Sequence, residues 1–471
     1  MNLEKSTGKI AGAQIGKALL NFLGITYFAR LLGPGGVGVF FLFQATMGIG
    51  VLVSDLGIQG AVEKRLSERQ LGGEVLTTGL VLKLLLLLLL SLSVLLFRSR
   101  INRYLGEELA FLLVLGIAAQ GISSLMIKVV NAELRVGETA FIRFSQQVVW
   151  IVVSAGLVYV GYGTASLIYG LLAGYVLSIA WAGYIARTPF GRPTVRSARS
   201  IFDYSKYNFV ASASWQIHNW ADVMIIGFFL TSSLVGAYEI AWRVSVLSVF
   251  FVNAINTTIF PQVSAWDETG NEERIQSLIP VVLLWSLLLV VPAFFGSMVL
   301  SREILELVFG TGYGTASLVL VLLMGEKIVQ ALYRPLKRIL EAVDRVDMAA
   351  RATVVGIVSN VALNVVLVPL AGIVGAAVAT GLSLCLMTAL VVYYLNDSVE
   401  IVFPYRRAAW LVVCSATMSS ALFALKSIRQ PASIAGLVAM VVTGALLYFG
   451  LLLINPAFRS ELSRVSGRVM G

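Results

Sequence analysis

Long apolar stretches separated by short polar segments follow one another along almost the whole chain of 471 residues. Each stretch is close to the roughly 20 residues that a helix needs to cross a hydrocarbon core of about 30 Å. The stretches are continuously apolar, as at Leu84–Leu90, and this predicts helices rather than the alternating strands of a barrel. We therefore expect about fourteen membrane spans, at residues 10–32, 36–58, 76–97, 109–130, 140–160, 165–186, 209–230, 235–260, 278–300, 317–340, 352–370, 373–395, 408–426 and 432–454.

The composition supports an all-α polytopic membrane protein. Hydrophobic residues make up 58% of the chain and charged residues 13%, whereas a soluble domain carries roughly 45–50% apolar and about 25% charged residues. Residues 1–9 are polar and precede a long apolar run, which predicts a retained first span rather than a cleaved signal. Cys385 and Cys414 fall inside predicted spans, so no disulfide framework is expected.

The connections between the spans carry lysine and arginine unevenly. The amino terminus, the even-to-odd connections and the carboxyl terminus hold about 23 of these residues and the opposite side about 7, which predicts that both termini are cytoplasmic. The net charge of +10 is spread over short loops that anchor topology and meet anionic headgroups, so we expect no nucleic-acid partner. We expect a multi-pass protein of a bacterial or archaeal cell membrane, and the composition of the first two spans favours an archaeon.

Two similar tight turns indicate an internal repeat. Leu32–Phe40 joins the first two spans and Leu230–Tyr238 joins the seventh and eighth, and both end in Val-Gly-small-aromatic. Because an even number of spans separates them, the halves would be parallel; alternatively, both turns are small-residue hairpins without common origin. The repeat predicts an N-lobe at 1–186, a cytoplasmic linker at 187–208, a C-lobe at 209–395, and two further spans with a tail at 396–471.

Several kinds of chemistry are missing from the sequence. No Gly-x-x-x-x-Gly-Lys-Ser/Thr pattern occurs, so the chain has no Walker A nucleotide site. His218 is the single histidine, and no Cys or carboxylate cluster stands beside it at metal-ligand spacing. The longest predicted outer loops, near 98–108 and 301–316, offer little from which to build a catalytic site. We expect no metal, no cofactor and no enzymatic activity.

Ionisable residues inside the predicted spans are the candidates for function, because such groups are costly in a membrane and usually face a cavity or a partner. Cations on helices of both halves would form a cleft that attracts an anion such as phosphate. Each ionisable candidate also has a simpler explanation. Lys17 and Lys83 can extend to the membrane surface. Glu239 can neutralise Arg243, Glu326 can neutralise Lys327, and Asp222 can pair with His218. The cationic candidates are Lys17, Arg30, Lys83, Arg243 and Lys327, and the polar or coupling candidates are Asn21, Asp55, His218, Asp222, Glu239 and Asn253.

Four segments resemble those of the polysaccharide biosynthesis flippases, often called Wzx-like. They are Tyr27–Gly38, Asp55–Arg65, Asp222–Gly227 with Val235–Tyr238, and Asn364–Pro369 with Gly372–Thr380. The resemblance implies the multidrug/oligosaccharidyl-lipid/polysaccharide exporter superfamily, whose members have two six-helix lobes in a V and work by alternating access. Fourteen spans are similar to the longer form found in lipid II flippases. The family's basic cavities strengthen the case for Lys17, Arg30 and Arg243.

The resemblance also implies the substrate, a sugar carried on a polyprenyl or dolichyl phosphate or diphosphate. We expect a flippase that moves this lipid-linked oligosaccharide to the outer leaflet, because a sugar headgroup cannot cross hydrocarbon unaided. Its partners would be membrane lipids, the lipid-linked oligosaccharide and a glycosyltransferase or polymerase of the same pathway. The alternatives are a multidrug/cation antiporter of the same architecture and a membrane oligosaccharide polymerase or ligase.

Overall fold

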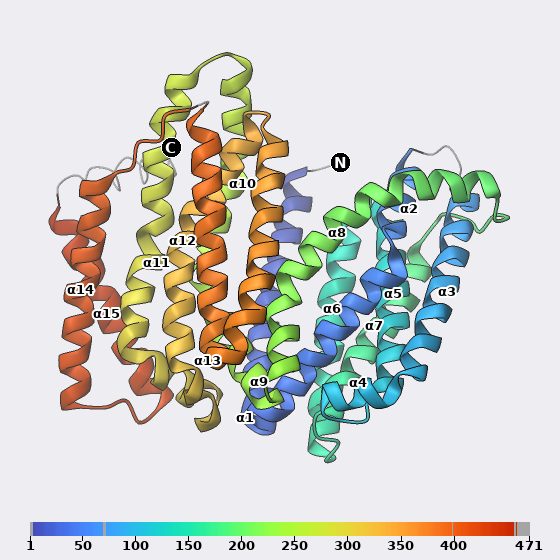
Figure 1. Cartoon of the computed structure of the whole chain (residues 1–471), viewed down its shortest axis with the longest axis horizontal. Coiled ribbons are helices and arrows are strands. Elements are labelled where there is room, and N and C mark those ends of the chain that lie inside the picture. Colours follow the sequence, from blue (N-terminus) through green and yellow to red (C-terminus); the bar gives the residue numbers. More distant parts are fainter. Residues whose placement is uncertain (1–2, 69–71, 398, 456–457, 459–471) are drawn as a thin grey trace. The chain divides into compact units, whose positions relative to one another are not determined.

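The computed structural model describes residues 3–68, 72–397, 399–455 and 458, without the side chains of some helical residues. The described residues form helices and no strand (Figure 1). The helices are α1 (Leu3–Asp55), α2 (Ile58–Ser67), α3 (Gly72–Leu96), α4 (Arg98–Leu105), α5 (Ala110–Ala132), α6 (Val136–Tyr159), α7 (Ala165–Ile185), α8 (Val195–Phe229), α9 (Ser232–Leu247), α10 (Phe250–Glu268), α11 (Glu272–Phe309), the 3-10 helix η1 (Thr311–Ala316), α12 (Ser317–Ala342), α13 (Val346–Asn396), α14 (Tyr405–Ile428) and α15 (Ile434–Ile454).

The expected all-α polytopic fold is confirmed. Among the described residues, 10 helices are long and apolar enough to cross a membrane. Two of them, α1 and α13, each contain two predicted spans, divided where Gly33 and Gly372 adopt positive φ angles of 67° and 60°. Glycine reaches these angles without the penalty that a Cβ atom brings. The chain can therefore reverse direction within a few residues.

The predicted span at 235–260 is wrong as a single helix. A turn at Ser248 and Val249 divides it into α9 and α10. The Ser245 hydroxyl donates to the Trp242 carbonyl at 2.8 Å, and the Ser248 hydroxyl donates to the Ser245 carbonyl at 2.7 Å. Serine hydroxyls that bond nearby carbonyls compete with the regular helical pattern, and here they accompany the break.

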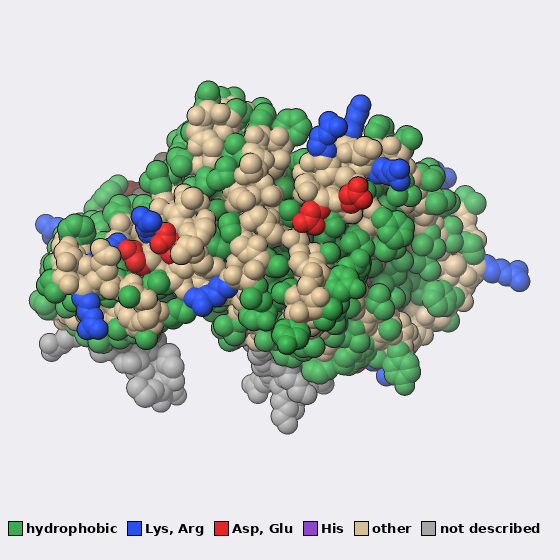
Figure 2. All heavy atoms as spheres, turned by 90° about the horizontal axis from the view of Figure 1, so that it is seen from below, with side chains coloured by type: hydrophobic (Ala, Val, Ile, Leu, Met, Phe, Trp, Pro, Cys, Tyr) green, Lys and Arg blue, Asp and Glu red, His purple; other side chains and the backbone are tan. Residues whose placement is uncertain are grey.

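The leucine run of α3 separates into two faces. Lys83 and Leu87, one helical turn apart, are buried, whereas Leu84 and Leu88 are 46% and 57% exposed. Exposed leucine is expected where a helix faces lipid. Figure 2 shows the molecule from below the view of Figure 1, where some charged side chains lie among hydrophobic ones.

The chain divides into two compact units, residues 1–236 and 237–471. The division lies within α9, later in the chain than the predicted linker at 187–208. Residues 195–208 of that linker form the first part of α8, which packs on α1, α2 and α3 inside the first unit.

In the second unit, α14 and α15 pack against α11. The Tyr448 hydroxyl donates to the Leu288 carbonyl at 2.8 Å. Lys426 lies 2.6 Å from Glu303 and also donates to the Val299 carbonyl. The two carboxyl-terminal helices are thus joined to this unit by polar bonds as well as by apolar packing.

The two similar turns detected in the sequence meet each other within the first unit. A Cβ atom on Gly38 would overlap the backbone carbonyl of Ser232, and one on Gly236 would overlap the carbonyl of Pro34. Each turn thus leaves room for the other turn's backbone. This reciprocal approach explains why both turns carry glycine after valine.

Gly38→Ala is expected to lower the free energy of unfolding by about 1–3 kcal/mol, because the added methyl group meets rigid backbone and the helices must separate. Gly156→Ala is the matched control: nothing lies within 4 Å of its Cβ position, and alanine favours a helix. Thermal unfolding of the purified proteins measures both changes. Equal midpoints for Gly38→Ala and the wild type would contradict the close approach.

Candidate functional site

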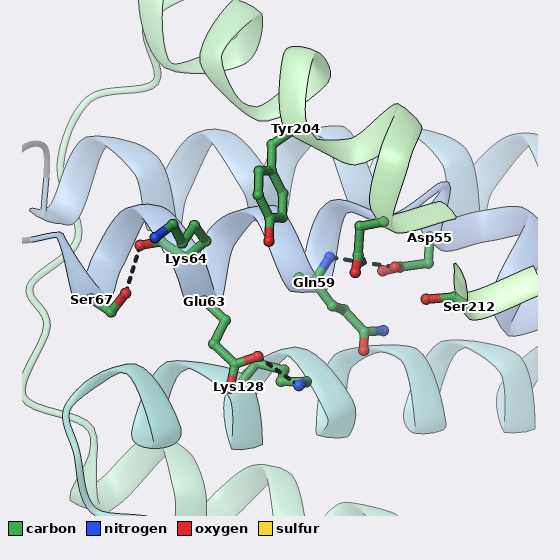
Figure 3. A pocket seen from close by; sticks show the side chains of 10 residues that line it. Asp55, Gln59, Glu63, Lys64, Ser67, Lys128, Tyr204 and Ser212 are labelled. Carbon is green, nitrogen blue, oxygen red and sulfur yellow. Dashed lines mark hydrogen bonds and ion pairs between the residues drawn. The ribbon is translucent and has the colours of Figure 1, made fainter. Parts of the chain in front are cut away.

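A cavity of about 340 Å³ lies in the first unit, lined by residues of α2, α5 and α8 and by the last residue of α1 (Figure 3). Its surface is polar, in contrast to the apolar cores around it. The lining residues are Asp55, Gln59, Gly60, Glu63, Lys64, Ser67, Lys128, Tyr204, Asn208 and Ser212.

The segment between α1 and α2 shapes this cavity. Leu56 and Gly57 adopt positive φ angles of 46° and 86°, which end α1 and begin α2. A Cβ atom on Gly57 would overlap the Ser205 carbonyl, and one on Gly60 would overlap the Asn208 side chain. The Asn208 amide donates to the Gly57 carbonyl at 3.2 Å. Glycine at both positions therefore lets α8 approach α2 closely.

Asp55 and Lys83, both candidates from the sequence, form a buried ion pair. The Lys83 Nζ lies 2.6 Å from Asp55 Oδ1, and the Lys83 side chain is fully buried. The second carboxylate oxygen accepts from the backbone N–H of Gln59 at 3.4 Å. Lys83 thus reaches a carboxylate inside the helical unit instead of snorkelling to the membrane surface.

Two further ion pairs at the cavity involve residues that the sequence did not single out. Lys128 lies 2.6 Å from Glu63, and Lys64 lies 3.2 Å from Glu68. Glu63 and Lys64 lie in the segment Asp55–Arg65. The resemblance of this segment to a family motif was the feature of the sequence that could have pointed to them. In the sequence, Lys128 counts only as one of the cations near the end of a span that set the orientation in the membrane.

In the second unit, two ion pairs join candidates. Arg243 Nε lies 3.2 Å from Glu239 on the same helix, and Lys327 lies 2.6 Å from Glu326. Lys327 Nζ also lies 5.8 Å from the ring centre of Trp242, within cation–π distance. Lys327 is thus close to α9 as well as to its own neighbour.

Arg334 is a site candidate that the sequence reading missed. It donates a hydrogen bond to the Asn253 side chain of α10. Arg334 follows Lys327 by seven positions on α12, which places both on one helical face. Between them, the Gln330 amide donates to Glu326 at 3.4 Å. Lys327 and Arg334 therefore share one face of α12, with Glu326 beside Lys327, whereas Arg243 and Glu239 form their own pair on α9.

Five candidates remain, and the structure describes the side chains of three of them. Arg30 is exposed, and Asn21 and Asp222 are half-buried. The side chains of Lys17 and His218 lie outside the described residues, and so does the predicted His218–Asp222 pair. In the described part of the chain, no group of three or more His, Cys, Asp or Glu residues could hold a metal ion.

The non-helical part of the predicted linker is attached to the first unit. Glu133 accepts from the backbone N–H groups of Arg187 and Thr188 at 2.7 and 2.8 Å, and from the Thr188 hydroxyl at 2.9 Å. Burial alone would raise the pKa of Glu133, but these bonds and one from Arg135 outweigh it and hold the pKa below the ordinary 4.5. Further along, the Gly191 N–H donates to the Gly73 carbonyl at 3.0 Å.

This lowered pKa predicts a pH-dependent contribution of Glu133 to stability. The contribution is fully present above pH 4.5 and is lost as the pH falls through the lower folded-state pKa. Glu133→Gln should therefore lower the free energy of unfolding by about 1 kcal/mol at pH 7, which corresponds to a shift of about one degree in the thermal midpoint. At pH values well below 4.5 the difference should shrink. Glu107→Gln, an exposed carboxylate, is the control, and a difference that does not change with pH would contradict the prediction.

Comparison with known proteins begins with a family model. The model described as "Polysaccharide biosynthesis protein" matches residues 27–318. The chain belongs to this family. Within the family, it is 44% identical over 459 residues to the probable low-salt glycan biosynthesis flippase Agl15 of the archaeon Haloferax volcanii, covering 98% of this chain and 97% of that one. It is 29% identical over 473 residues to the probable flippase AglR of the same organism, covering 98% of both chains.

Solved structures with the same fold include two transporter classes. The lipid II flippase MurJ in an inward closed conformation superposes with a TM-score of 0.80 at 15% identity, over 96% of this chain and 99% of that one. An inward-facing multidrug resistance MATE transporter of the MOP superfamily gives 0.60 at 18% identity, over 83% and 95%. The predicted family is confirmed, and the protein is a multi-pass membrane protein. Its relatives are named as flippases and transporters rather than catalysts, which supports the prediction that it is not an enzyme.

Proposed function

We propose that this protein is a flippase that moves a lipid-linked oligosaccharide from the cytoplasmic to the outer leaflet by alternating access. The observation that carries the proposal is the 44% identity, over almost the full length of both chains, to a probable flippase of glycan biosynthesis. The substrate would be a glycan on a polyprenyl or dolichyl phosphate or diphosphate. The lipid tail would stay in hydrocarbon while polar helix faces shelter the headgroup, whose unaided transfer would cost its hydrogen bonds with water.

The phosphate end of the substrate has the clearest candidate partners in the second unit. Arg243 lies on α9 and Lys327 and Arg334 lie on α12, and charge-assisted bonds from arginine suit phosphate oxygens. We propose that Lys17 and Arg30, in the first half, also bind an anionic group of the substrate. Lys83 has a different role in this proposal, because Asp55 already neutralises it in a buried pair.

The pairing of the carboxylates also bears on the antiporter alternative. A cationic drug would be attracted by carboxylates that lack a cationic partner, whereas Glu239 and Glu326 are each paired with a cation. The likeness to multidrug transporters is one of fold, at 18% identity. An anionic substrate therefore fits this chain better than a cationic one.

The proposed direction of transport requires a defined orientation, which the loop charges predict. Reporter fusions within 187–208 and after Gly471 are expected to be cytoplasmic, and a fusion within 301–316 is expected to be external. Paired reporters that are active on opposite sides of the membrane measure this. A cytoplasmic 301–316 would contradict the orientation.

Deletion of the gene tests the proposed function. Intact lipid-linked glycans should accumulate on the cytoplasmic leaflet while surface glycan is lost, as measured by mass spectrometry of extracted lipids and by surface glycan staining. A strain that lacks the lipid-linked glycans altogether would indicate a synthetic enzyme instead. Unchanged surface glycan, in a strain with no second flippase gene, would contradict the proposal.

A further inference from the structure

The cavity of the first unit has its charges balanced in pairs. Asp55 is paired with Lys83 and Glu63 with Lys128, both at 2.6 Å, and Lys64 is paired with Glu68 at 3.2 Å. The four charged residues that line the cavity, two carboxylates and two lysines, sum to zero; outside the lining, Glu68 is shared between Lys64 and Arg65. An anion such as phosphate would have to displace a carboxylate from its partner, so the cavity is a poor phosphate site. A lipid tail is equally unsuited, because the lining is polar.

Neutral hydrogen-bonding groups face the same space. Within the described part of the chain, the side chains of Gln59, Tyr204 and Ser212 make no hydrogen bond to another protein group, and all three line the cavity. Figure 3 shows Tyr204 reaching from α8 towards α2, with Glu63 and Lys128 meeting on the opposite side. An amide and two hydroxyls can each donate and accept. The paired carboxylates hold further lone pairs in fixed positions.

This combination fits a hydroxyl-rich ligand without net charge. Every hydroxyl of a sugar ring donates one hydrogen bond and accepts others, so it needs donors and acceptors side by side. The cavity, at about 340 Å³, is near the lower end of ligand pockets, which hold roughly 300–1,000 Å³. It therefore has room for part of a glycan, about one or two rings.

We propose that this cavity is a sugar-binding site, which holds a neutral sugar ring of the glycan headgroup through Gln59, Tyr204 and Ser212. The inference rests on the proposed function for its substrate, and it assigns glycan recognition and phosphate binding to different helices. The ion pairs Asp55–Lys83 and Glu63–Lys128 keep the cavity walls in place and supply fixed acceptors. The glycines at positions 57 and 60 bring α8 close enough to α2 to close the cavity on one side.

Binding to the full-length protein in lipid nanodiscs tests this inference. The probes are the free glycan released by mild acid from the lipid-linked fraction of the deletion strain, and inorganic diphosphate. Gln59→Leu and Ser212→Phe should each weaken glycan binding by about five- to tenfold, through a lost hydrogen bond in one and a filled cavity in the other. Diphosphate binding should equal that of the wild type in both variants.

Gln262→Leu is the matched control, since Gln262 is an exposed amide on α10 and lies outside the cavity. It should bind both probes as the wild type does. Glycan binding that is unchanged in both cavity variants would overturn the inference, and so would an equal loss of glycan and diphosphate binding. Transport of the intact lipid-linked fraction by the wild type is measured in parallel. If the wild type transports and the cavity variants bind the glycan as the wild type does, the sugar site alone is refuted. If the wild type does not transport, the proposed function is refuted.

Discussion

Replacing Lys83 with methionine is expected to lower the free energy of unfolding by about 3–5 kcal/mol, because it leaves the Asp55 carboxylate buried without its partner. The Lys83 side chain is fully buried, the Asp55 side chain is 11% exposed, and the two meet at 2.6 Å. Truncating one member removes the attraction but not the cost of burying the other charge. Thermal or denaturant unfolding of the purified protein measures the change.

Two further variants separate this effect from simple loss of a lysine. Lys64→Met removes a half-exposed lysine whose pair with Glu68 is worth about 0–1 kcal/mol at most. The double variant Lys83→Met with Asp55→Leu should recover most of the lost stability, since well-packed apolar groups often replace a buried pair without cost. A single Lys83→Met variant as stable as the wild type would contradict the buried pair.

Arg243→Gln is expected to abolish transport, whereas Glu239→Gln should retain it. The two residues form an i,i+4 pair at 3.2 Å, but only the arginine would meet the substrate phosphate. Removing it costs a charge-assisted bond of about 1.5–3 kcal/mol, or about 10- to 150-fold in binding, and leaves Glu239 to repel the anion. Surface glycan in complemented deletion strains, at matched protein levels, measures both variants.

The control and the double variant decide what the pair does. Arg302→Gln breaks another i,i+4 pair, with Glu306, whose arginine side chain is 70% exposed, and it should leave transport unchanged. A purely structural Arg243–Glu239 pair predicts similar damage from either change and recovery in the double variant. If Glu239→Gln proves the more damaging, the phosphate role of Arg243 is wrong and the carboxylate is the functional group.

Hydropathy was sufficient to predict the helices, because a membrane span has little choice but to be an apolar helix. The span at 235–260 was one exception, and α4 and the first part of α8 are helices that lie in predicted connections. The apolar character of that span is continuous across Ser245 and Ser248, and the break depends on where their hydroxyls bond. Local hydrogen bonding of this kind leaves no mark in hydropathy.

Pairing of charges could be predicted only where the partners are close in sequence. Glu239 with Arg243 and Glu326 with Lys327 follow from helical spacing, and both pairs are present. Lys83 with Asp55 joins residues 28 positions apart, and their meeting depends on how α3 packs beside the end of α1. The same dependence on packing hid Arg334, whose partner Asn253 lies on another helix.

The contacts of the glycines likewise depend on packing between segments that are distant in the sequence. In the sequence, Gly57, Gly60 and Gly38 are parts of segments that resemble the family's, and the sequence does not indicate which other segments they meet. In the structure each one lies where a Cβ atom would meet another segment, Ser205, Asn208 or Ser232. The motifs therefore encode close helix packing, and the cavity of the first unit is one product of that packing.

The most direct test of the flippase function is reconstitution of the purified protein in liposomes that contain lipid-linked oligosaccharide from the deletion strain. A glycosidase or lectin added outside reaches only glycans on the outer leaflet. Wild-type protein should make the glycans of the inner leaflet accessible, while Arg243→Gln liposomes should behave like liposomes without protein. If wild-type liposomes expose inner-leaflet glycans no faster than liposomes without protein, the flippase function is contradicted.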